Sequence, residues 1–300
     1  MEFRDTFIFK FCKKHSNLLP KKVAHTIRYR NCHKKWMDWN NPKTLDEKLH
    51  WSMVYNIGKN EALYADKLKV RDYIKACGYE DLLVPLVFED GFSNTAQIPF
   101  EQLPNKFVIK ANNGSGPEYL SICTNKEDYD KDVEFKKLDK AVKSDFSIDS
   151  NEYHYKFIDR KILIEKYLEN MDGSGIIDYK FFCFHGNVHI IQTISERNGH
   201  NFKINYYDKD WNIVDCGQTV SLGNFVQRPK SLNKLIQACC DIGKNMPFAR
   251  IDFYEIDGKP YFGEITLTPA GGYLYYLKED MQYELGELFE LRKKGENYVF

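Results

Sequence analysis

The sequence predicts an α+β protein of several packed lobes, with a helical N-terminal region. Helix signals come first along the chain, a mixed region follows, and strand signals that suit antiparallel pairing dominate from residue 178 onward. Aromatic residues make up 15% of the 300 residues, which favours strands over a helical bundle. A chain of this length can bury a sizeable core without disulfides or metals.

The N-terminal region, 1–104, is predicted to be a helical and mixed lobe. Thr44 and Glu47 have the spacing of a capping box, and apolar residues follow at i, i+4 and i+8. A second helix is predicted from Glu61 to Cys77, and a strand from Leu82 to Phe88. Prolines just before residue 105 then mark the boundary of a new region.

The central region, 105–168, is bounded by two predicted strands, 106–111 and 161–168, with helix and loop between 125 and 150. The C-terminal region, 169–300, is predicted to hold an antiparallel sheet. Its strands are expected at 178–184, 187–194, 203–208, 211–216, 248–256 and 260–267. A helix capped by Ser231 is expected to run to about Met246.

Charge is distributed unevenly along a chain whose formal net charge is zero. Residues 1–35 contain ten Lys or Arg and two acids, a net charge of +8, with phenylalanines between them. Such a segment suits peripheral contact with an anionic membrane surface or a lipid-linked anionic substrate. The alternative is a solvated helical arm. No nucleic-acid-binding motif accompanies the charge, so a nucleic-acid partner is not expected.

The eight cysteines include no CxxC pair, and the N-terminal apolar stretch is broken by lysines. These features predict reduced cysteines in a cytoplasmic protein. The longest apolar runs are too short to span a bilayer.

The first motif with chemical meaning is Lys110 followed by the glycine-rich stretch 112–116, Asn-Asn-Gly-Ser-Gly. Glycines let backbone N–H groups close over phosphate oxygens, and a nearby lysine neutralises their charge. The lysine precedes the glycines, so this is not a Walker A loop. The alternative is a flexible turn after a strand.

A second motif places Arg250 and Asp252 on one strand and Glu264 on the next. If the loop 257–259 is a three-residue hairpin loop, Asp252 lies directly opposite Glu264. Two facing carboxylates need a cation between them, and their oxygens suit Mg²⁺. A two-residue turn would instead put the acids on opposite faces, and would favour an exposed face with an Arg–Asp contact and no metal.

A third motif, Glu165-Lys166-Tyr167-Leu168, ends a buried strand, and by itself can simply mark where that strand leaves the core. Together, however, the ordered set of motifs resembles the ATP-grasp superfamily, and more narrowly the TupA-like ATP-grasp family linked to teichuronopeptide and capsular polysaccharide synthesis. The matching stretches are 41–51, 64–74, 106–116, 162–168, 178–186, 248–272 and 285–289.

The resemblance implies an ATP-grasp fold, with the nucleotide held between two α+β lobes, and roles for individual residues. The expected ATP-binding residues are Lys67, Lys110, Asn113, Gly114, Ser115, Gly116, Glu165, Lys166, Tyr167, Leu168 and Asp178. The expected Mg²⁺ ligands are Asp252, Glu264 and Thr266, where Thr266 stands in place of an asparagine found in many relatives. Arg250 and Lys180 are expected to be catalytic, and Gly271 and Gly272 to bind substrate.

The resemblance also implies an activity: ATP-dependent ligation of a carboxylate to an amine through an acyl phosphate. The expected partners are ATP, a uronic acid of a surface glycan, and a small amine such as an amino acid or amino alcohol. A kinase acting on a sugar or polyol hydroxyl would share every nucleotide residue. A catalytically silent glycan-binding module is a third possibility, against which the intact lysine and carboxylates argue.

Overall fold

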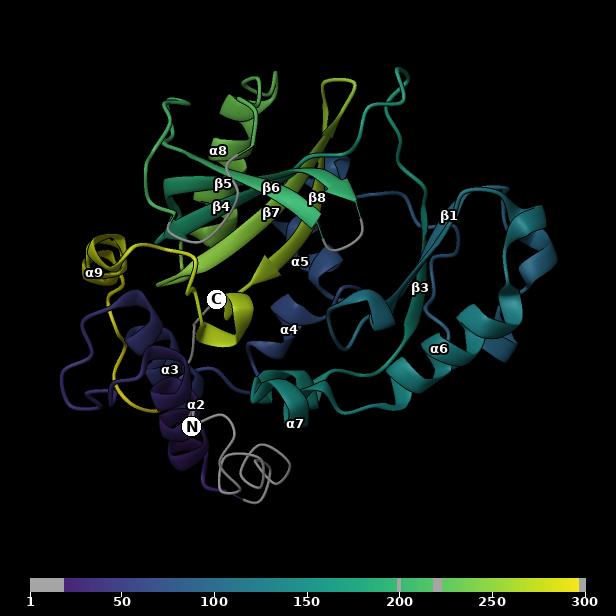
Figure 1. Ribbon diagram of the computed structural model, residues 1–300. Coiled ribbons are helices and arrows are strands. Elements are labelled where there is room, and N and C mark those ends of the chain that lie inside the picture. Colours follow the sequence, from purple (N-terminus) through teal and green to yellow (C-terminus); the bar gives the residue numbers. More distant parts are fainter. Residues whose placement is uncertain (1–18, 199–200, 218–222, 297–300) are drawn as a thin grey trace.

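Two antiparallel sheets, on opposite sides of the molecule, organise the chain (Figure 1). The structure is a computed structural model that describes residues 19–198, 201–217 and 223–296. The small sheet has the order β2-β1-β3 and the large sheet β6-β5-β4-β7-β8. The strands are β1 (Phe107–Ala111), β2 (Leu120–Cys123), β3 (Ile162–Lys166), β4 (Asp178–Phe184), β5 (Asn187–Asn198), β6 (Asn201–Tyr207), β7 (Ala249–Ile256) and β8 (Lys259–Thr266).

Helices cover both faces of the large sheet. The α-helices are α2 (Lys21–His33), α3 (Leu45–Tyr55), α4 (Ala62–Ala65), α5 (Val70–Ala76), α6 (Lys131–Lys143), α7 (Phe146–Ser150), α8 (Leu232–Gly243) and α9 (Glu279–Leu288). Helix α8 packs its buried residues against one face of the sheet, in a core that includes Phe181 and Ile251. Helices α3 and α9 contribute to a second core on the other face, around Phe182 and Phe184.

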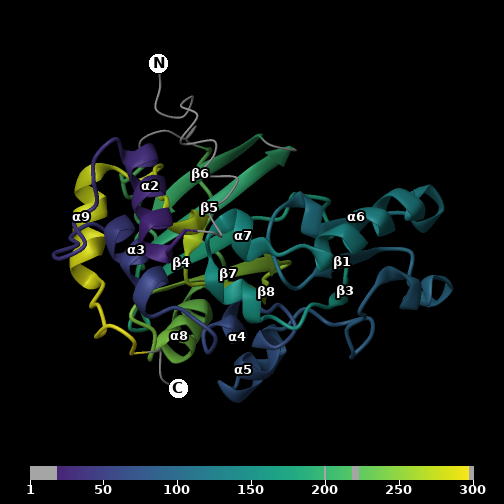
Figure 2. The ribbon, with the colours of Figure 1, turned by 90° about the horizontal axis from the view of Figure 1, so that it is seen from below.

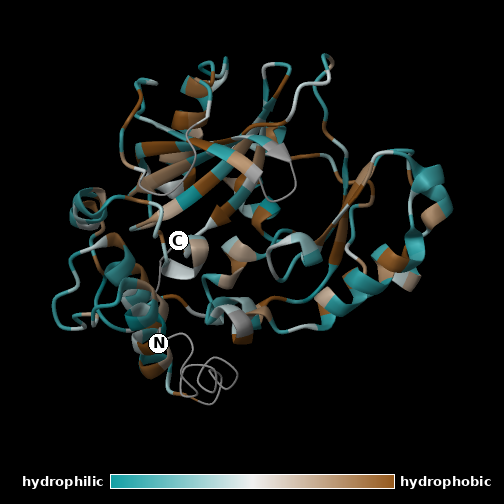
Figure 3. Cartoon of the chain, viewed as in Figure 1, coloured by the Kyte–Doolittle hydropathy of each residue, from teal (hydrophilic) through white to brown (hydrophobic). Residues whose placement is uncertain are grey.

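Both views place α2, α3 and α9 together at one end of the large sheet, and the small sheet with α6 at the other (Figures 1 and 2). Hydrophobic residues are concentrated along β3 and the strands of the large sheet, whereas α9 is mainly hydrophilic (Figure 3). The small sheet has its own core, formed with α6. The two sheets fall within the regions 105–168 and 169–300, and the division of the chain into domains at these boundaries stays a prediction.

The predicted helix 61–77 is wrong in one respect, because it is interrupted at Asp66. This residue has an extended backbone, and its Oδ1 accepts hydrogen bonds from the N–H groups of Leu68 and Lys69 at 2.9 and 3.2 Å. A carboxylate in this position competes with continued helix and starts a new turn. The capping box of Thr44 and Glu47 is confirmed at the start of α3.

Two predicted strands, 82–88 and 211–216, are absent, and only isolated bridges occur there. Leu83 pairs with β8 and Leu86 with β3, so this segment passes between the sheets and extends neither of them. Pro85 between them has no N–H to donate to a ladder. In the second segment, Trp211 has a φ of +71° and stacks on Tyr207, which turns the chain out of the sheet.

The other predicted strands are present, with ends that shift by a few residues. Helices α6 and α7 lie within the region 125–150 predicted as helix and loop, and α8 corresponds to the helix predicted from Ser231 to about Met246. Ser231 precedes α8 as expected but does not cap it with its side chain. Its hydroxyl instead donates to Glu255 Oε2 at 2.5 Å.

The hairpin between β7 and β8 differs from its predicted form but reaches the predicted register. The turn contains two residues, Asp257 and Gly258, both with positive φ, and Ile256 pairs with Lys259. A β-bulge at Gly263 then shifts the register by one residue, so that Asp252 still lies opposite Glu264. The bulge therefore cancels the effect of the shorter turn and returns both acids to one face.

The basic N-terminal segment is described only in part. Its phenylalanines Phe3, Phe7, Phe9 and Phe11 lie outside the described residues, so membrane contact stays a prediction. Among the residues that the structure does describe, no helix combines the length and apolar character needed to cross a bilayer.

We expect Gly263→Ala to lower the free energy of unfolding by about 1–3 kcal/mol, the usual cost of forcing an atom into a packed site. A Cβ at this position would lie 3.0 Å from the carbonyl oxygen of Asp252 and 3.2 Å from the Tyr254 ring. Urea unfolding measures the change. Gly58→Ala is the control, since its nearest neighbour would lie at 3.9 Å. Equal stability of the two variants would contradict a tightly packed bulge.

Candidate nucleotide-binding site

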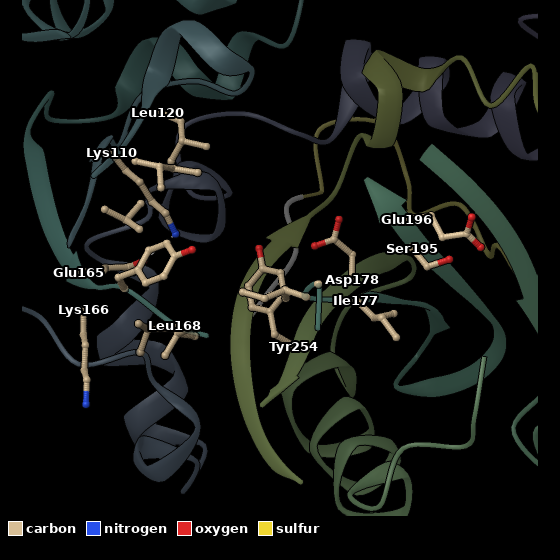
Figure 4. A pocket seen from close by; sticks show the side chains of 16 residues that line it. Lys110, Leu120, Glu165, Lys166, Leu168, Ile177, Asp178, Ser195, Glu196 and Tyr254 are labelled. Atoms are coloured by element: carbon tan, nitrogen blue, oxygen red, sulfur yellow. Dashed lines mark hydrogen bonds and ion pairs between the residues drawn. The ribbon is translucent and has the colours of Figure 1, made fainter. Parts of the chain in front are cut away.

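A cavity of about 620 Å³ lies between the two sheets, and strands β1 and β3 form one wall (Figure 4). Lys110 on β1 and Glu165 on β3 meet there, with Nζ and Oε2 2.5 Å apart. Arg71 approaches the same carboxylate from α5, at 3.8 Å. Glu165 is buried and neutralised by cations from two elements. The segment Glu165–Leu168, predicted to meet adenine, lines the cavity.

The large sheet forms the opposite wall, where Tyr254 on β7 and Asp178 on β4 face the β1–β3 side (Figure 4). Aliphatic side chains line the space between the walls; they include Val84, Val108, Leu120 and Ile122. A mostly apolar slot with a few polar groups at its edges suits a planar base with a polar rim.

A second cavity, of about 210 Å³, adjoins the first and shares Lys110, Glu165 and Tyr254 with it. The loop residues Gly114, Ser115 and Gly116 line it, as do Lys67 and Glu264. Gly114 packs so closely on Tyr119 that an added Cβ would lie 2.3 Å from the ring, and Gly116 has a φ of +104°. Both positions therefore require glycine.

The place of Lys67 beside this loop is fixed by its neighbour Asp66. Asn112, at the start of the loop, donates its side-chain amide to Asp66 Oδ1 at 2.8 Å and to the Asp159 carbonyl at 2.9 Å. The same Asp66 ends α4. Lys67 Nζ then donates to the carbonyl of Gly114. Burial lowers the pKa of Lys67, an effect that the acids around it partly offset.

Besides the two cavities, a row of charged side chains crosses three strands of the large sheet. Lys180 on β4 lies opposite Asp252 on β7, and Asp252 lies opposite Glu264 on β8. Lys180 Nζ is 2.6 Å from Asp252 Oδ2. Because side chains at paired positions share a face, the row is a direct consequence of the register.

Arg250 holds the row together from the same strand as Asp252. Its guanidinium donates to both oxygens of Asp252, each at 2.7 Å, to Glu264 Oε1 at 3.1 Å and to Thr266 Oγ1 at 3.2 Å. The burial of Glu264 opposes its ionisation, but Arg250, Lys67 and Lys180 outweigh it and lower the pKa of Glu264 to about 2. The carboxylate is therefore charged at neutral pH.

These residues fit the Mg²⁺ expected from the sequence. Asp252 and Glu264 present carboxylate oxygens on one face, and the Thr266 hydroxyl donates to Glu264 Oε1 at 3.1 Å. Among the described residues, no group of three or more His, Cys, Asp or Glu is arranged to hold a metal. Mg²⁺ commonly takes only one or two carboxylates and completes its shell with nucleotide phosphates and water.

The predicted substrate residues Gly271 and Gly272 lie in a 3₁₀ turn, η9 (Pro269–Gly272), just after β8, with φ of +62° and +81°. A Cβ on Gly272 would lie 2.6 Å from Met53 Cε. Beside this turn, buried Glu152 accepts a hydrogen bond from the Thr268 hydroxyl.

Most predicted site residues line the two cavities or belong to the charged row, but Asn113, Gly271 and Gly272 line neither cavity. Asn113 is buried and donates its amide to carbonyls at the end of α6, including that of Ser144 at 3.1 Å. The sequence analysis missed Tyr254, Arg71 and Glu152. Strand alternation from Arg250 and Asp252 could have found Tyr254, whereas Arg71 and Glu152 come from distant segments without a recognisable motif.

A nucleotide-sized cavity between the two sheets, with a lysine, a glycine-rich loop and paired carboxylates, is the arrangement that the resemblance to ATP-grasp enzymes implies. The sequence profile of the TupA-like ATPgrasp family matches residues 47–290. The chain belongs to this family, and is therefore an ATP-dependent enzyme of the ligase class. No curated protein matches the chain in sequence.

Solved structures of several ATP-grasp enzymes resemble the chain weakly. N5-carboxyaminoimidazole synthetase from Staphylococcus aureus with ADP has 14% identity, a TM-score of 0.48, and covers 91% of this chain and 65% of its own. D-alanine–D-alanine ligase from Bacillus anthracis has 18% identity, a TM-score of 0.45, and covers 81% and 69%. These TM-scores lie below 0.5, so the family assignment rests on the sequence match.

We expect Glu152→Gln to remove a pH dependence of stability. Burial raises the pKa of Glu152 to about 7, so between pH 4.5 and 7 the folded protein binds a proton that the unfolded chain has released. Its contribution to stability is present below pH 4.5 and lost as pH rises through 7. The variant should gain up to about 3 kcal/mol over the wild type across this range.

Urea unfolding at several pH values measures this gain. Glu101→Gln, at an exposed glutamate, is the matched control. Parallel stability profiles for Glu152→Gln and the wild type would show that Glu152 titrates normally.

Proposed function

We propose that the protein is a carboxylate–amine ligase that joins a small amine to a uronic acid of a bacterial surface glycan. The observation that carries the proposal is the charged row Lys180–Asp252–Glu264 with Arg250 beside it, at the phosphate end of the nucleotide-sized cavity. The uronic acid follows from the resemblance to enzymes of capsular polysaccharide synthesis.

The reaction needs charge neutralisation and positioning rather than a protein nucleophile. An oxygen of the acceptor carboxylate attacks the γ-phosphorus of ATP, the bond to the bridging oxygen breaks, and ADP leaves. The amine then attacks the acyl carbon, phosphate leaves, and the ammonium proton goes to solvent or a base. Positioning of two reactants and preorganised charge can supply most of such an acceleration.

Each cation of the site has a task in this scheme. Lys110 and Lys67 lie where they can neutralise phosphate oxygens beside the loop 113–116. Arg250 and Lys180 lie where they can hold the acceptor carboxylate and the transferred phosphoryl group. Bound Mg²⁺, held by Asp252 and Glu264, would supply further charge neutralisation at the phosphates.

Incubation of the protein with ATP, Mg²⁺, a panel of uronates and a panel of amines tests the function. We expect mass spectrometry to detect an amide product, and ADP release to depend on both the uronate and the amine. ADP release with a phosphorylated sugar and no need for an amine would instead indicate a kinase. ADP release that no member of either panel stimulates would contradict the proposed substrates.

We expect Lys110→Ala to weaken ATP binding by at least about tenfold, since a half-buried cation facing the phosphates typically contributes about 1.5–3 kcal/mol. Isothermal titration with ATP and Mg²⁺ measures the affinity. Lys209→Ala is the control, because Lys209 is exposed, pairs with Asp210 and lines neither cavity. Unchanged ATP affinity in a folded Lys110→Ala protein would remove Lys110 from the site.

A further inference from the structure

The side chain of Asn113, the first residue of the glycine-rich loop 113–116, contacts the end of a helix and lines neither cavity. It is buried, and its amide lies within hydrogen-bond distance of three carbonyl oxygens at the end of α6: those of Ala141 at 3.3 Å, Val142 at 3.5 Å and Ser144 at 3.1 Å. The last carbonyls of an α-helix have no partner within the helix. The amide of Asn113 therefore supplies donors that α6 lacks.

Tyr119 connects the loop to the same helix end a second time. Its hydroxyl and the Ser144 hydroxyl are hydrogen-bonded at 2.7 Å, and Ser144 Oγ also donates to the Ala141 carbonyl at 2.7 Å. Gly114 packs directly on the Tyr119 ring, where an added Cβ would lie 2.3 Å away. The loop thus lies against a ring that Ser144 holds in place, and Ser144 also accepts from Asn113.

Helix α6 is a firm support for these contacts. Four of its residues, Phe135, Leu138, Ala141 and Val142, are buried in the core of the small sheet. That core also contains Ile109 on β1, one residue before Lys110. The position of the loop relative to Lys110 is therefore set by packing within one lobe.

The contact that the loop makes with the first lobe is of a different kind. Lys67 Nζ donates to the carbonyl of Gly114, and both residues line the smaller cavity, where phosphates are expected. A bound phosphate competes with that carbonyl for the ammonium group. The bonds of Asn113 and Tyr119 to the end of α6 face no such competition.

We propose that Asn113 and Ser144 are positioning residues, which hold the loop 113–116 over the phosphates of ATP from the end of α6. Backbone N–H groups bind phosphate oxygens only at hydrogen-bond distance, so a displaced loop loses phosphate contacts. No residue of the loop lines the larger cavity, where adenine is expected, so adenine contacts stay intact. The proposal concerns ATP binding alone and does not depend on the proposed uronate and amine.

The test compares the affinities of ATP with Mg²⁺ and of adenosine for the full chain and its Asn113→Ala variant. Titration calorimetry measures ATP, and ligand-observed NMR measures the weaker adenosine. We expect ATP to bind at least about tenfold more weakly to the variant, the usual effect of losing one charge-assisted hydrogen bond, and adenosine to bind equally well. Ser144→Ala should weaken ATP in the same direction but less, because its backbone carbonyl still accepts from Asn113.

Asn56→Ala is the matched control. Asn56 is also buried, and its amide donates to the carbonyls of Lys293 at 2.8 Å and Glu296 at 2.7 Å. In both asparagines, Oδ1 has no hydrogen-bond partner within the part of the chain that the structure describes. Asn56 lines neither cavity. We expect its loss to lower the melting temperature about as much as that of Asn113, with both affinities unchanged.

Unchanged ATP affinity in Asn113→Ala, equal losses for ATP and adenosine, or the same ATP loss in Asn56→Ala would overturn the proposal. If Asn113→Ala does not fold, Ser144→Ala decides, and full ATP affinity in that variant would overturn the proposal as well. Because binding is measured without acceptor or amine, these outcomes are distinct from failure of the ligase assay, which would remove the proposed function instead.

Discussion

The carboxylates of Asp252 and Glu264, which face each other at the end of a buried hairpin, set the central constraint on this structure. Two like charges that face each other closely repel and are tolerated only beside compensating cations. Arg250 comes from the same strand, Lys180 from the neighbouring strand, and Lys67 from the first lobe. The N-terminal lobe is therefore connected to the large sheet through charge as well as packing.

The need to place both carboxylates on the same face of the sheet explains the bulge at Gly263. A regular hairpin with the observed two-residue turn would place Glu264 on the face covered by α8, where its charge would meet an apolar core. One extra residue rotates Glu264 to the side of Asp252. Only glycine fits there without strain, because the backbone of Asp252 lies against it. A local irregularity thus determines whether the site exists.

Sequence reasoning was most successful where neighbours along the chain decide the outcome. The capping box at Thr44 and the strands with strong apolar runs follow from local pattern. The turn has two residues, the alternative that was expected to separate the acids, and Asp252 and Glu264 still face each other because the bulge at Gly263 compensates. The assignment of Lys67 and Gly271 to a site needed the ordered family resemblance, since neither has a distinctive local pattern.

Features decided by distant contacts could not be predicted. At the helix break, Asp66 accepts a hydrogen bond from Asn112, which follows it by 46 residues, in addition to its local bonds. The segment 82–88 has strand-like composition, but both sheets compete for it, and it pairs once with each. Burial among distant segments raises the pKa of Glu152 to about 7, and Thr268 and Arg28, from other parts of the chain, limit that rise. Periodicity contains no information on such contacts.

A final consequence concerns the way in which ATP enters such a site. Lys110 is paired with Glu165, and Lys180 and Arg250 with Asp252, so these three cations already have a carboxylate partner, whereas Lys67 donates to the Gly114 carbonyl. Binding of an anionic nucleotide together with Mg²⁺ would exchange partners: the phosphates take the lysines, and the metal takes the released carboxylate of Asp252. The number of buried unpaired charges stays low throughout, which avoids the several kcal/mol that each would cost. The carboxylates therefore keep the site folded and its charges balanced both with and without bound nucleotide and Mg²⁺.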